Sequence, residues 1–103
     1  MSAAKTKAQT LINENGVVVF SKSYCPYCTA TKSTLKDAGA KFTVLELNEI
    51  VDDGPAIQNA LVEISNQRTV PNVFIQGKHI GGNSDLQAKK AQLPALLKEA
   101  GAL

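Results

Sequence analysis

Residues 17–28 read VVVFSKSYCPYC, and they join a short apolar run to both cysteines of the chain. The run VVVF is β-branched and uninterrupted by polar residues, which is typical of a strand buried on both faces. Pro26 follows Cys25 directly, and proline suits the first turn of a helix because no intrahelical bond needs its missing N–H there. The stretch therefore predicts a buried strand that leads into a helix, with Cys25 at the junction.

Helical and extended patterns alternate along the rest of the chain. Apolar residues at helical spacing mark the helices, whereas short alternating or β-branched runs mark the strands. We expect helices over residues 3–13, from directly after Cys25 to Ala38, over residues 55–64, and in a final region that Ser84 or Asp85 caps and Pro94 restarts. Strands are expected over residues 17–20, 41–47, 73–75 and 79–80, with an acidic turn at residues 48–54.

The order of these elements predicts an α/β fold. Two early strands joined through a helix form a parallel pair, and the Gln76-Gly77-Lys78 connection predicts an antiparallel hairpin. We therefore expect one small mixed sheet of four strands with helices on both faces, in a single domain over residues 1–103. In open α/β sheets, chemistry usually takes place where a strand ends and a helix begins, which is where the cysteines fall.

Composition and charge limit the function classes. The chain has 103 residues, 44% of them hydrophobic, which suits one compact core. Its formal net charge is +2 and its lysines are scattered, so nucleic-acid binding has little support. The first residues lack the apolar stretch of a signal peptide, and no run approaches the ~18 apolar residues of a membrane span. We expect a cytosolic monomer with no membrane or nucleic-acid partner.

The two cysteines fit thiol–disulfide chemistry. Persistent disulfides are rare in the cytosol, so a close pair there is more often redox-active or metal-binding than structural. A sulfur at the start of a helix lies at the positive end of the helix dipole, beside free backbone N–H groups, and both features favour a thiolate at Cys25. Lys22 adds positive charge nearby. Cys28, one turn further along, should be shielded and remain a thiol that attacks second.

Three alternatives stay open for the pair. The cysteines could form an inert disulfide within the helix or simply fill the core. A structural zinc site is a weaker alternative, because zinc takes four ligands and the chain offers two cysteines and one histidine. That histidine, His79, falls in the expected hairpin and is more typical of a surface position. The spacing favours a redox pair, but it does not choose a substrate.

Residues 68–75, RTVPNVFI, place Pro71 immediately before a strand. Proline is tolerated at a strand's first position because it donates no bond to the ladder there. If the Val70–Pro71 peptide bond is cis, Val70 would turn its backbone N–H and C=O outward, ready to pair with an extended peptide. An ordinary trans proline at a strand start is the alternative.

Residues 81–86, GGNSDL, could hold a small zwitterion. Gly81 and Gly82 permit close backbone approach, and the helix start at Ser84 and Asp85 would offer N–H groups for a carboxylate beside a side-chain carboxylate for an ammonium. The alternative is simple helix capping by Ser84 or Asp85.

Together, SKSYCPYC, RTVPNVFI and GGNSDL, in this order and at this spacing, resemble the dithiol glutaredoxins, the glutathione-dependent branch of the thioredoxin fold. C-P-Y-C is the signature of that branch. Thioredoxins carry a tryptophan before C-G-P-C, whereas this chain has no tryptophan, and monothiol glutaredoxins carry C-G-F-S. The resemblance covers nearly the whole chain and implies a thioredoxin-like fold.

The resemblance implies a glutathione-dependent reductase of protein–glutathione mixed disulfides and small disulfides, with no metal. Cys25 would be the nucleophile that takes up glutathione, and Cys28 the resolving thiol. Lys22 and Gln58 would meet the glycine carboxylate of glutathione, with Arg68 as a helper. The other implied contacts are Tyr27 as a wall of the groove, Thr69, Val70 and Pro71 along the peptide, and Ser84 and Asp85 at the γ-glutamyl end.

Two other functions remain within the same fold. Some relatives bridge two subunits with a [2Fe–2S] cluster, through the first active-site cysteine of each and two glutathiones, and Cys25 could serve as such a ligand. Pro26 counts against this alternative, because cluster binding in the family is more typical of glycine-containing motifs. An inactive scaffold would carry an unreactive Cys25.

Overall fold

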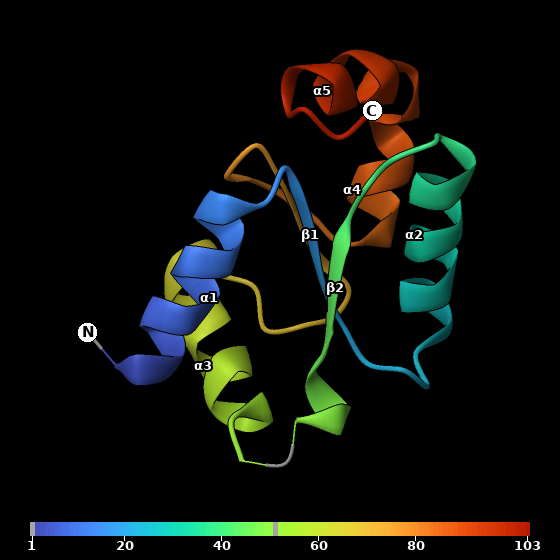
Figure 1. The fold of residues 1–103 in the computed structure, drawn as a ribbon. Helices are drawn as coiled ribbons and strands as arrows, with labels where there is room; N and C mark the ends of the chain where they lie inside the picture. The colour runs from blue at the N-terminus through green and yellow to red at the C-terminus, as the bar shows by residue number, and fades with distance from the viewer. Residues whose placement is uncertain (1, 51) are drawn as a thin grey trace.

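The computed structural model describes residues 2–50 and 52–103, and its elements follow the expected order (Figure 1). The long helices are α1 (Ala3–Glu14), α2 (Pro26–Asp37) and α3 (Gly54–Ser65), and the strands are β1 (Val17–Ser21), β2 (Thr43–Glu46), β3 (Asn72–Ile75) and β4 (Lys78–Gly81). The final helical region is divided into α4 (Asn83–Ala88), a 3-10 turn η2 (Lys90–Gln92) and α5 (Leu93–Glu99). A further 3-10 turn, η1 (Leu47–Glu49), follows β2.

The four strands form the mixed sheet that the sequence predicts, in the order β2-β1-β3-β4. Strands β1 and β2 are parallel, whereas β1 with β3 and β3 with β4 are antiparallel. All residues of β1 and β3 are buried. These two strands occupy the centre of the sheet with helices over both faces, which explains their continuous apolar sequences.

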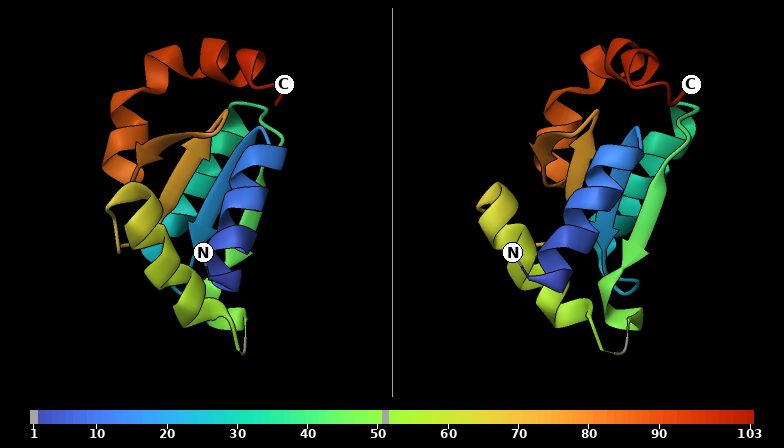
Figure 2. Two further views of the ribbon diagram at one scale, coloured as in Figure 1. Left: turned by 90° about the vertical axis from the view of Figure 1, so that its left-hand side faces the viewer. Right: turned by 60° about the vertical axis from the view of Figure 1, so that its left-hand side comes forward.

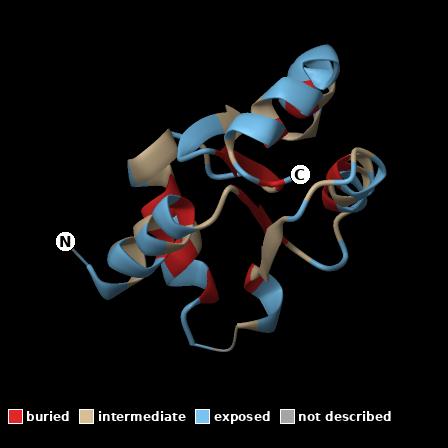
Figure 3. Cartoon of the chain, turned by 45° about the horizontal axis from the view of Figure 1, so that its top comes forward, coloured by how far each residue is buried: buried red, intermediate tan, exposed pale blue. Residues whose placement is uncertain are grey.

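The helices cover the two faces of the sheet as expected, α1 and α3 on one side and α2 and α4 on the other (Figures 1 and 2). Alternate residues of each strand enter different cores, because successive side chains point to opposite faces. Figure 3 shows the buried residues gathered on the sheet and on the inner sides of the helices. The first core, under α2, α4 and α5, contains Val17, Val19, Leu35, Val73, Leu86 and Leu97. The second, under α1 and α3, contains Ile12, Val18, Phe20, Ile57, Leu61 and Phe74.

The expected strand over residues 41–47 is wrong at both ends. β2 spans only Thr43–Glu46, because Leu47 begins η1 and is buried in the second core. At the other end, Lys41 N–H donates to the carbonyl of Ala102 near the C-terminus at 2.7 Å instead of to a neighbouring strand. The expected acidic turn at 48–54 therefore begins within η1 and ends where α3 starts at Gly54. Its residue Val51 lies outside the described residues.

The expected cap of the final helical region is also corrected. Gly82 is the N-cap of α4, so the helix starts at Asn83, before Ser84 and Asp85. Asp85 instead accepts a hydrogen bond from Gly82 N–H through Oδ2 at 2.9 Å, from within the first turn. The restart at Pro94 is confirmed, since this proline lies in the first turn of α5.

Candidate active site

The sheet topology brings three distant stretches of sequence to one edge. Because β3 runs antiparallel to β1, its first residue, Asn72, pairs with Phe20 near the end of β1. β4 reverses direction again, so its last residue, Gly81, pairs with Val73 near the start of β3. The residues that follow β1, precede β3 and follow β4 therefore meet. These are the three stretches in which the sequence places its candidate site.

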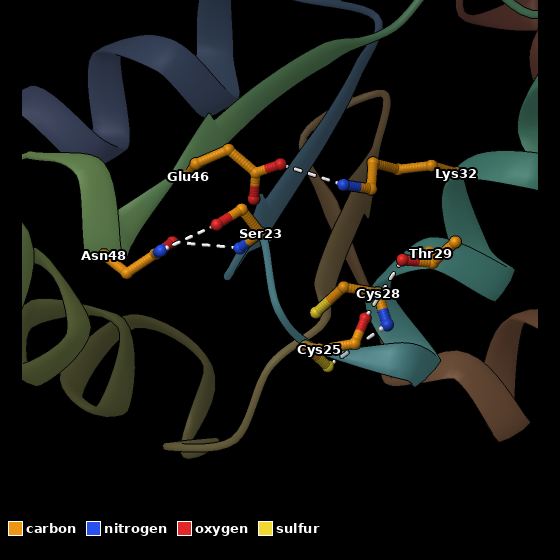
Figure 4. A network of polar contacts seen from close by, with 7 residues as sticks. All are labelled: Ser23, Cys25, Cys28, Thr29, Lys32, Glu46 and Asn48. Carbon is orange, nitrogen blue, oxygen red and sulfur yellow. Dashed lines mark hydrogen bonds and ion pairs between the residues drawn. The ribbon is translucent and has the colours of Figure 1, made fainter.

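Cys25 sits at the N-terminus of α2 and caps it (Figure 4). Its Sγ accepts a hydrogen bond from Cys28 N–H at 3.2 Å, which satisfies one of the helix's free donors. The same sulfur lies 4.0 Å from the carbonyl oxygen of Val70, across the site. Cys25 is partly exposed, so a substrate can reach a sulfur that is already bonded to a backbone N–H.

Cys28 is fully buried directly behind Cys25, and its expected shielding is confirmed. Burial raises the pKa of the Cys28 thiol, and its hydrogen bonding with Cys25 raises it further. Cys28 is therefore held as a thiol at neutral pH. The two cysteines differ in the way that a nucleophile and a resolving thiol should differ: one is accessible and the other is buried and protonated.

A groove of about 320 Å³ opens beside the cysteines. The Val70–Pro71 peptide bond in its wall is cis, the first of the two alternatives that the sequence leaves open. Tyr27 borders the groove with its side chain largely exposed. The structure thus brings most of the predicted contact residues together around one groove. Its lining consists of Tyr27, Thr69, Val70, Pro71, Gly82, Asn83 and Ser84.

Lys22 and Gln58 line a second cavity of about 250 Å³, together with residues of η1 and the start of α3. Cys25 N–H donates to the Lys22 carbonyl at 3.0 Å, so this cavity adjoins the loop that carries the nucleophile. Lys22 and Gln58, which the resemblance assigns to the glycine carboxylate of glutathione, therefore line one cavity. Gln58 also donates to the Arg68 carbonyl at 2.9 Å, which ties α3 to the segment before β3.

Arg68 and Asp85 line neither cavity. The Arg68 guanidinium donates to Asn59 Oδ1 on α3 at 2.8 Å. Asp85 faces the backbone at the end of β4, where Gly81 has a φ of +122°. A Cβ on Gly81 would collide with the Asp85 carboxylate, so only glycine fits this close approach. Asp85 therefore holds the shape of the groove's Gly82 edge.

Two asparagines that sequence reasoning left out position the site. Asn83 lines the groove, and its Oδ1 accepts from Thr31 Oγ1 of α2 at 2.9 Å. Asn48 of η1 accepts from Ser23 N–H at 2.9 Å and donates to Ser23 Oγ at 2.7 Å, which fixes the loop before Cys25 (Figure 4). Each pair joins residues far apart in the chain, so no local signal could have found it.

Among residues 2–50 and 52–103, no group of three or more histidine, cysteine or acidic side chains is placed to hold a metal ion. His79 is exposed on the edge strand β4 and contacts Gln67 Oε1 at 3.2 Å. No helix in this part of the chain combines the length and the apolar character needed to cross a membrane.

Comparisons with known proteins agree with this geometry. The Glutaredoxin family model matches residues 17–80. A glutaredoxin from Ricinus communis is 56% identical over 102 residues, which cover 97% of this chain and 99% of that protein. Glutaredoxin-C2 from Arabidopsis thaliana is 52% identical over 103 residues, with 97% and 91% covered. The crystal structure of the buckwheat glutaredoxin–glutathione complex superimposes with a TM-score of 0.91 at 47% identity, covering 97% of this chain and 92% of that one. The chain therefore belongs to the glutaredoxin family.

Proposed function

We infer that the protein is a glutathione-dependent thiol–disulfide oxidoreductase. It reduces mixed disulfides between glutathione and other thiols, and small disulfides. The observation that carries this function is the asymmetry of its two thiols: Cys25 is accessible at a helix N-terminus beside a groove, and Cys28 is buried and protonated behind it. Only the first can begin the reaction, and the second can only complete it.

The first step is the attack of the Cys25 thiolate on the glutathionyl sulfur of the substrate. The bond between the substrate and glutathione breaks, and the substrate leaves as a thiol after taking up a proton. A second glutathione thiolate then attacks the mixed disulfide at Cys25 and leaves with the first as glutathione disulfide. In the alternative second step, Cys28 attacks Cys25 and releases glutathione.

We place glutathione across both cavities, with its cysteine at Val70. The Val70 carbonyl, 4.0 Å from Cys25 Sγ, would pair with the peptide and aim its sulfur at the nucleophile. Lys22 and Gln58 would hold the glycine carboxylate. The hydrogen bond from Gln58 to the Arg68 carbonyl would fix the position of Gln58. Thr69, Pro71, Tyr27 and Ser84 would wall the groove, and Asp85 would face the ammonium. The glutathione complex of the buckwheat relative supports this proposal.

We also propose that the protein acts as a cytosolic monomer on glutathionylated proteins. Tyr24 and Tyr27 flank Cys25, with 70% and 68% of their surfaces exposed, and they leave the nucleophile open to large substrates. Such a substrate needs only to present its mixed disulfide, because the glutathione part supplies most of the recognition.

The function is tested by following the reduction of a small glutathione mixed disulfide, coupled through glutathione reductase to the oxidation of NADPH. We expect a rate that saturates with glutathione and is lower when another small thiol replaces it at the same concentration. Absence of turnover with glutathione, in protein whose circular dichroism spectrum shows a folded state, would contradict the proposal.

Lys22→Ala is expected to raise the KM for glutathione about two- to fivefold while kcat changes little. An accessible ion pair contributes about 0.5–1 kcal/mol, which corresponds to that factor. The matched control is Lys36→Ala, which removes an exposed lysine from the last turn of α2. An equal KM in the two variants would remove Lys22 from the binding site.

Asp85→Asn is expected to raise the KM for glutathione about two- to fivefold, because the amide keeps an acceptor for Gly82 N–H but has no charge for the ammonium. Asp85→Ala loses both and should raise KM at least as much. Steady-state kinetics at varied glutathione checks both variants. If Asp85→Asn behaves as wild type and only Asp85→Ala is impaired, Asp85 merely shapes the groove.

A further inference from the structure

Ser21 and Glu46 lie side by side on the face of the sheet that α2 covers. Val17 and Val19 of β1 belong to the core under α2, and Ser21 continues their alternation onto the same face. Val44 of β2 packs against that core as well, so Glu46 also faces α2. Ser21 and Glu46 are direct partners in the parallel ladder. The side chains of Ser21 and Glu46 are therefore the polar ends of two otherwise apolar rows on this face of the sheet. They lie at the edge of the sheet that carries the active site.

Helix α2 places Cys28 and Lys32 over this pair. They are one turn apart and share a face of the helix. Lys32 Nζ lies 2.8 Å from Glu46 Oε2, so the ion pair joins α2 to β2 (Figure 4). The Glu46 side chain is 20% exposed, which connects this buried region to the surface. The same cluster thus contains a fully buried thiol and a carboxylate that reaches solvent.

Two atoms of the cluster have no hydrogen-bond partner in the described structure: Ser21 Oγ and Glu46 Oε1, both enclosed. A native protein seldom leaves such atoms unpaired without a reason. A carboxylate can only accept, so Ser21 must be the donor between them, and its oxygen can then accept from the Cys28 thiol. The donor order that pairs Ser21 with both of its neighbours runs from Cys28 to Ser21 to Glu46.

The charges around the cluster suit proton movement in that direction. Burial pushes the pKa of Glu46 upward, but the ion pair with Lys32 and the nearby Ser21 hydroxyl outweigh it and hold this pKa below its usual value. Glu46 is therefore ionised near neutral pH and able to accept a proton. Burial is also the main reason that the pKa of Cys28 is raised, while the Ser21 hydroxyl works in the opposite direction. The Ser21 hydroxyl is thus near enough to lower the pKa values of both Cys28 and Glu46, although it forms no hydrogen bond within the described residues.

We propose that Ser21 and Glu46 form a proton path from the buried Cys28 thiol to solvent during the second step of the dithiol reaction. The inference rests on the proposed function, because it needs a glutathione mixed disulfide at Cys25. The Cys28 sulfur bonds to the Cys25 sulfur, and the bond between Cys25 and glutathione breaks with its electron pair on the glutathione sulfur. The Cys28 proton passes to Ser21 Oγ as the Ser21 proton passes to Glu46. Glu46 then releases a proton to solvent, which protonates the glutathione thiolate.

The path explains how a buried thiol can react near neutral pH. Few other charged groups face Cys28. Cys25 lies beside it on α2, and Lys22 acts on it through its backbone. Helix α4 also packs against α2, and its single charged side chain, Asp85, bonds to Gly82 N–H instead. Ser21 and Glu46 are therefore positioning residues for the proton of Cys28, whereas Cys25 and Cys28 are the catalytic residues.

The test measures ring closure directly. Reduced protein is mixed with glutathione disulfide, quenched at intervals with an alkylating agent, and analysed by mass spectrometry, which separates the mixed disulfide from the closed Cys25–Cys28 disulfide. The variants are Ser21→Ala, Glu46→Gln and Ser21→Thr, which retains the hydroxyl. Ser33→Ala, which removes an exposed hydroxyl from α2, is the matched control.

Near neutral pH we expect Ser21→Ala and Glu46→Gln to slow closure about tenfold or more, in line with the contribution of positioned proton transfer. Ser21→Thr and Ser33→Ala should close at rates near that of wild type. The difference in closure rate between Ser21→Ala and wild type should become smaller at alkaline pH, where solvent alone removes the Cys28 proton. Wild-type closure rates in both variants, or a deficit independent of pH, would overturn the proton path. Failure of wild-type protein to form the mixed disulfide at all would instead overturn the proposed function.

Discussion

Cys25→Ser is expected to lower the rate of glutathione-dependent disulfide reduction by roughly a thousandfold or more, the size of effect seen when an enzyme loses its nucleophile. Serine keeps the size and the capping position but remains a neutral hydroxyl. The Cys25 sulfur is also the only accessible one that can form the mixed disulfide, because the Cys28 sulfur is fully buried behind it. The coupled assay with a small glutathione mixed disulfide measures the loss.

Cys28→Ser is the matched control for this prediction. It removes the other thiol and leaves the accessible sulfur in place, so glutathionyl transfer through Cys25 and a second glutathione should continue. Reduction of substrates that require the closed disulfide should fail. Equal loss of glutathionyl transfer in the two variants would show that the cysteines act as one unit and that their asymmetry has no functional meaning.

The largest expected effect on stability is that of Phe20→Ala, which should lower the free energy of unfolding by about 3–5 kcal/mol. Phe20 is fully buried in the central strand β1, within the core that α1 and α3 cover. Its ring meets that of Phe74 edge to face, with centroids 5.9 Å apart and planes at 88°. The substitution removes this contact and leaves a cavity in a region held from both sides. Urea unfolding followed by circular dichroism measures the change.

Tyr24→Ala serves as the matched aromatic control, since 70% of Tyr24 is exposed. Its effect on unfolding should stay within about 0.5 kcal/mol, as for most surface substitutions. A loss for Phe20→Ala no larger than that of Tyr24→Ala would mean that the second core does not hold the sheet together.

The parts of the fold that follow from local pattern were predictable from sequence. The run Val17–Phe20 indicated a strand buried on both faces, because such a strand needs no alternation. Pro26 indicated the start of α2, and with it the placement of Cys25. The hairpin and the order of elements predicted a mixed sheet, whereas the strand order β2-β1-β3-β4, which makes the strand ends meet, comes from the structure. The proximity of the three candidate stretches is a consequence of that topology.

The rest depends on contacts that no local pattern encodes. β2 ends early because Leu47 turns into a core formed largely by α1 and α3. The helix cap shifts to Gly82 because Asp85 reaches back to its N–H. Ser21 falls just beyond the strand expected over residues 17–20, and Glu46 falls within the one expected over residues 41–47. Only their pairing across the parallel ladder, beneath Cys28, gives them a joint role.

Mass spectrometry of the Cys28→Ser variant after incubation with glutathione disulfide, followed by peptide mapping, tests most directly whether Cys25 is the nucleophile. We expect one glutathione per chain, attached to Cys25, which fresh reduced glutathione removes. A folded variant that takes up no glutathione would contradict the central claim that Cys25 is the nucleophile of a glutathione-dependent oxidoreductase.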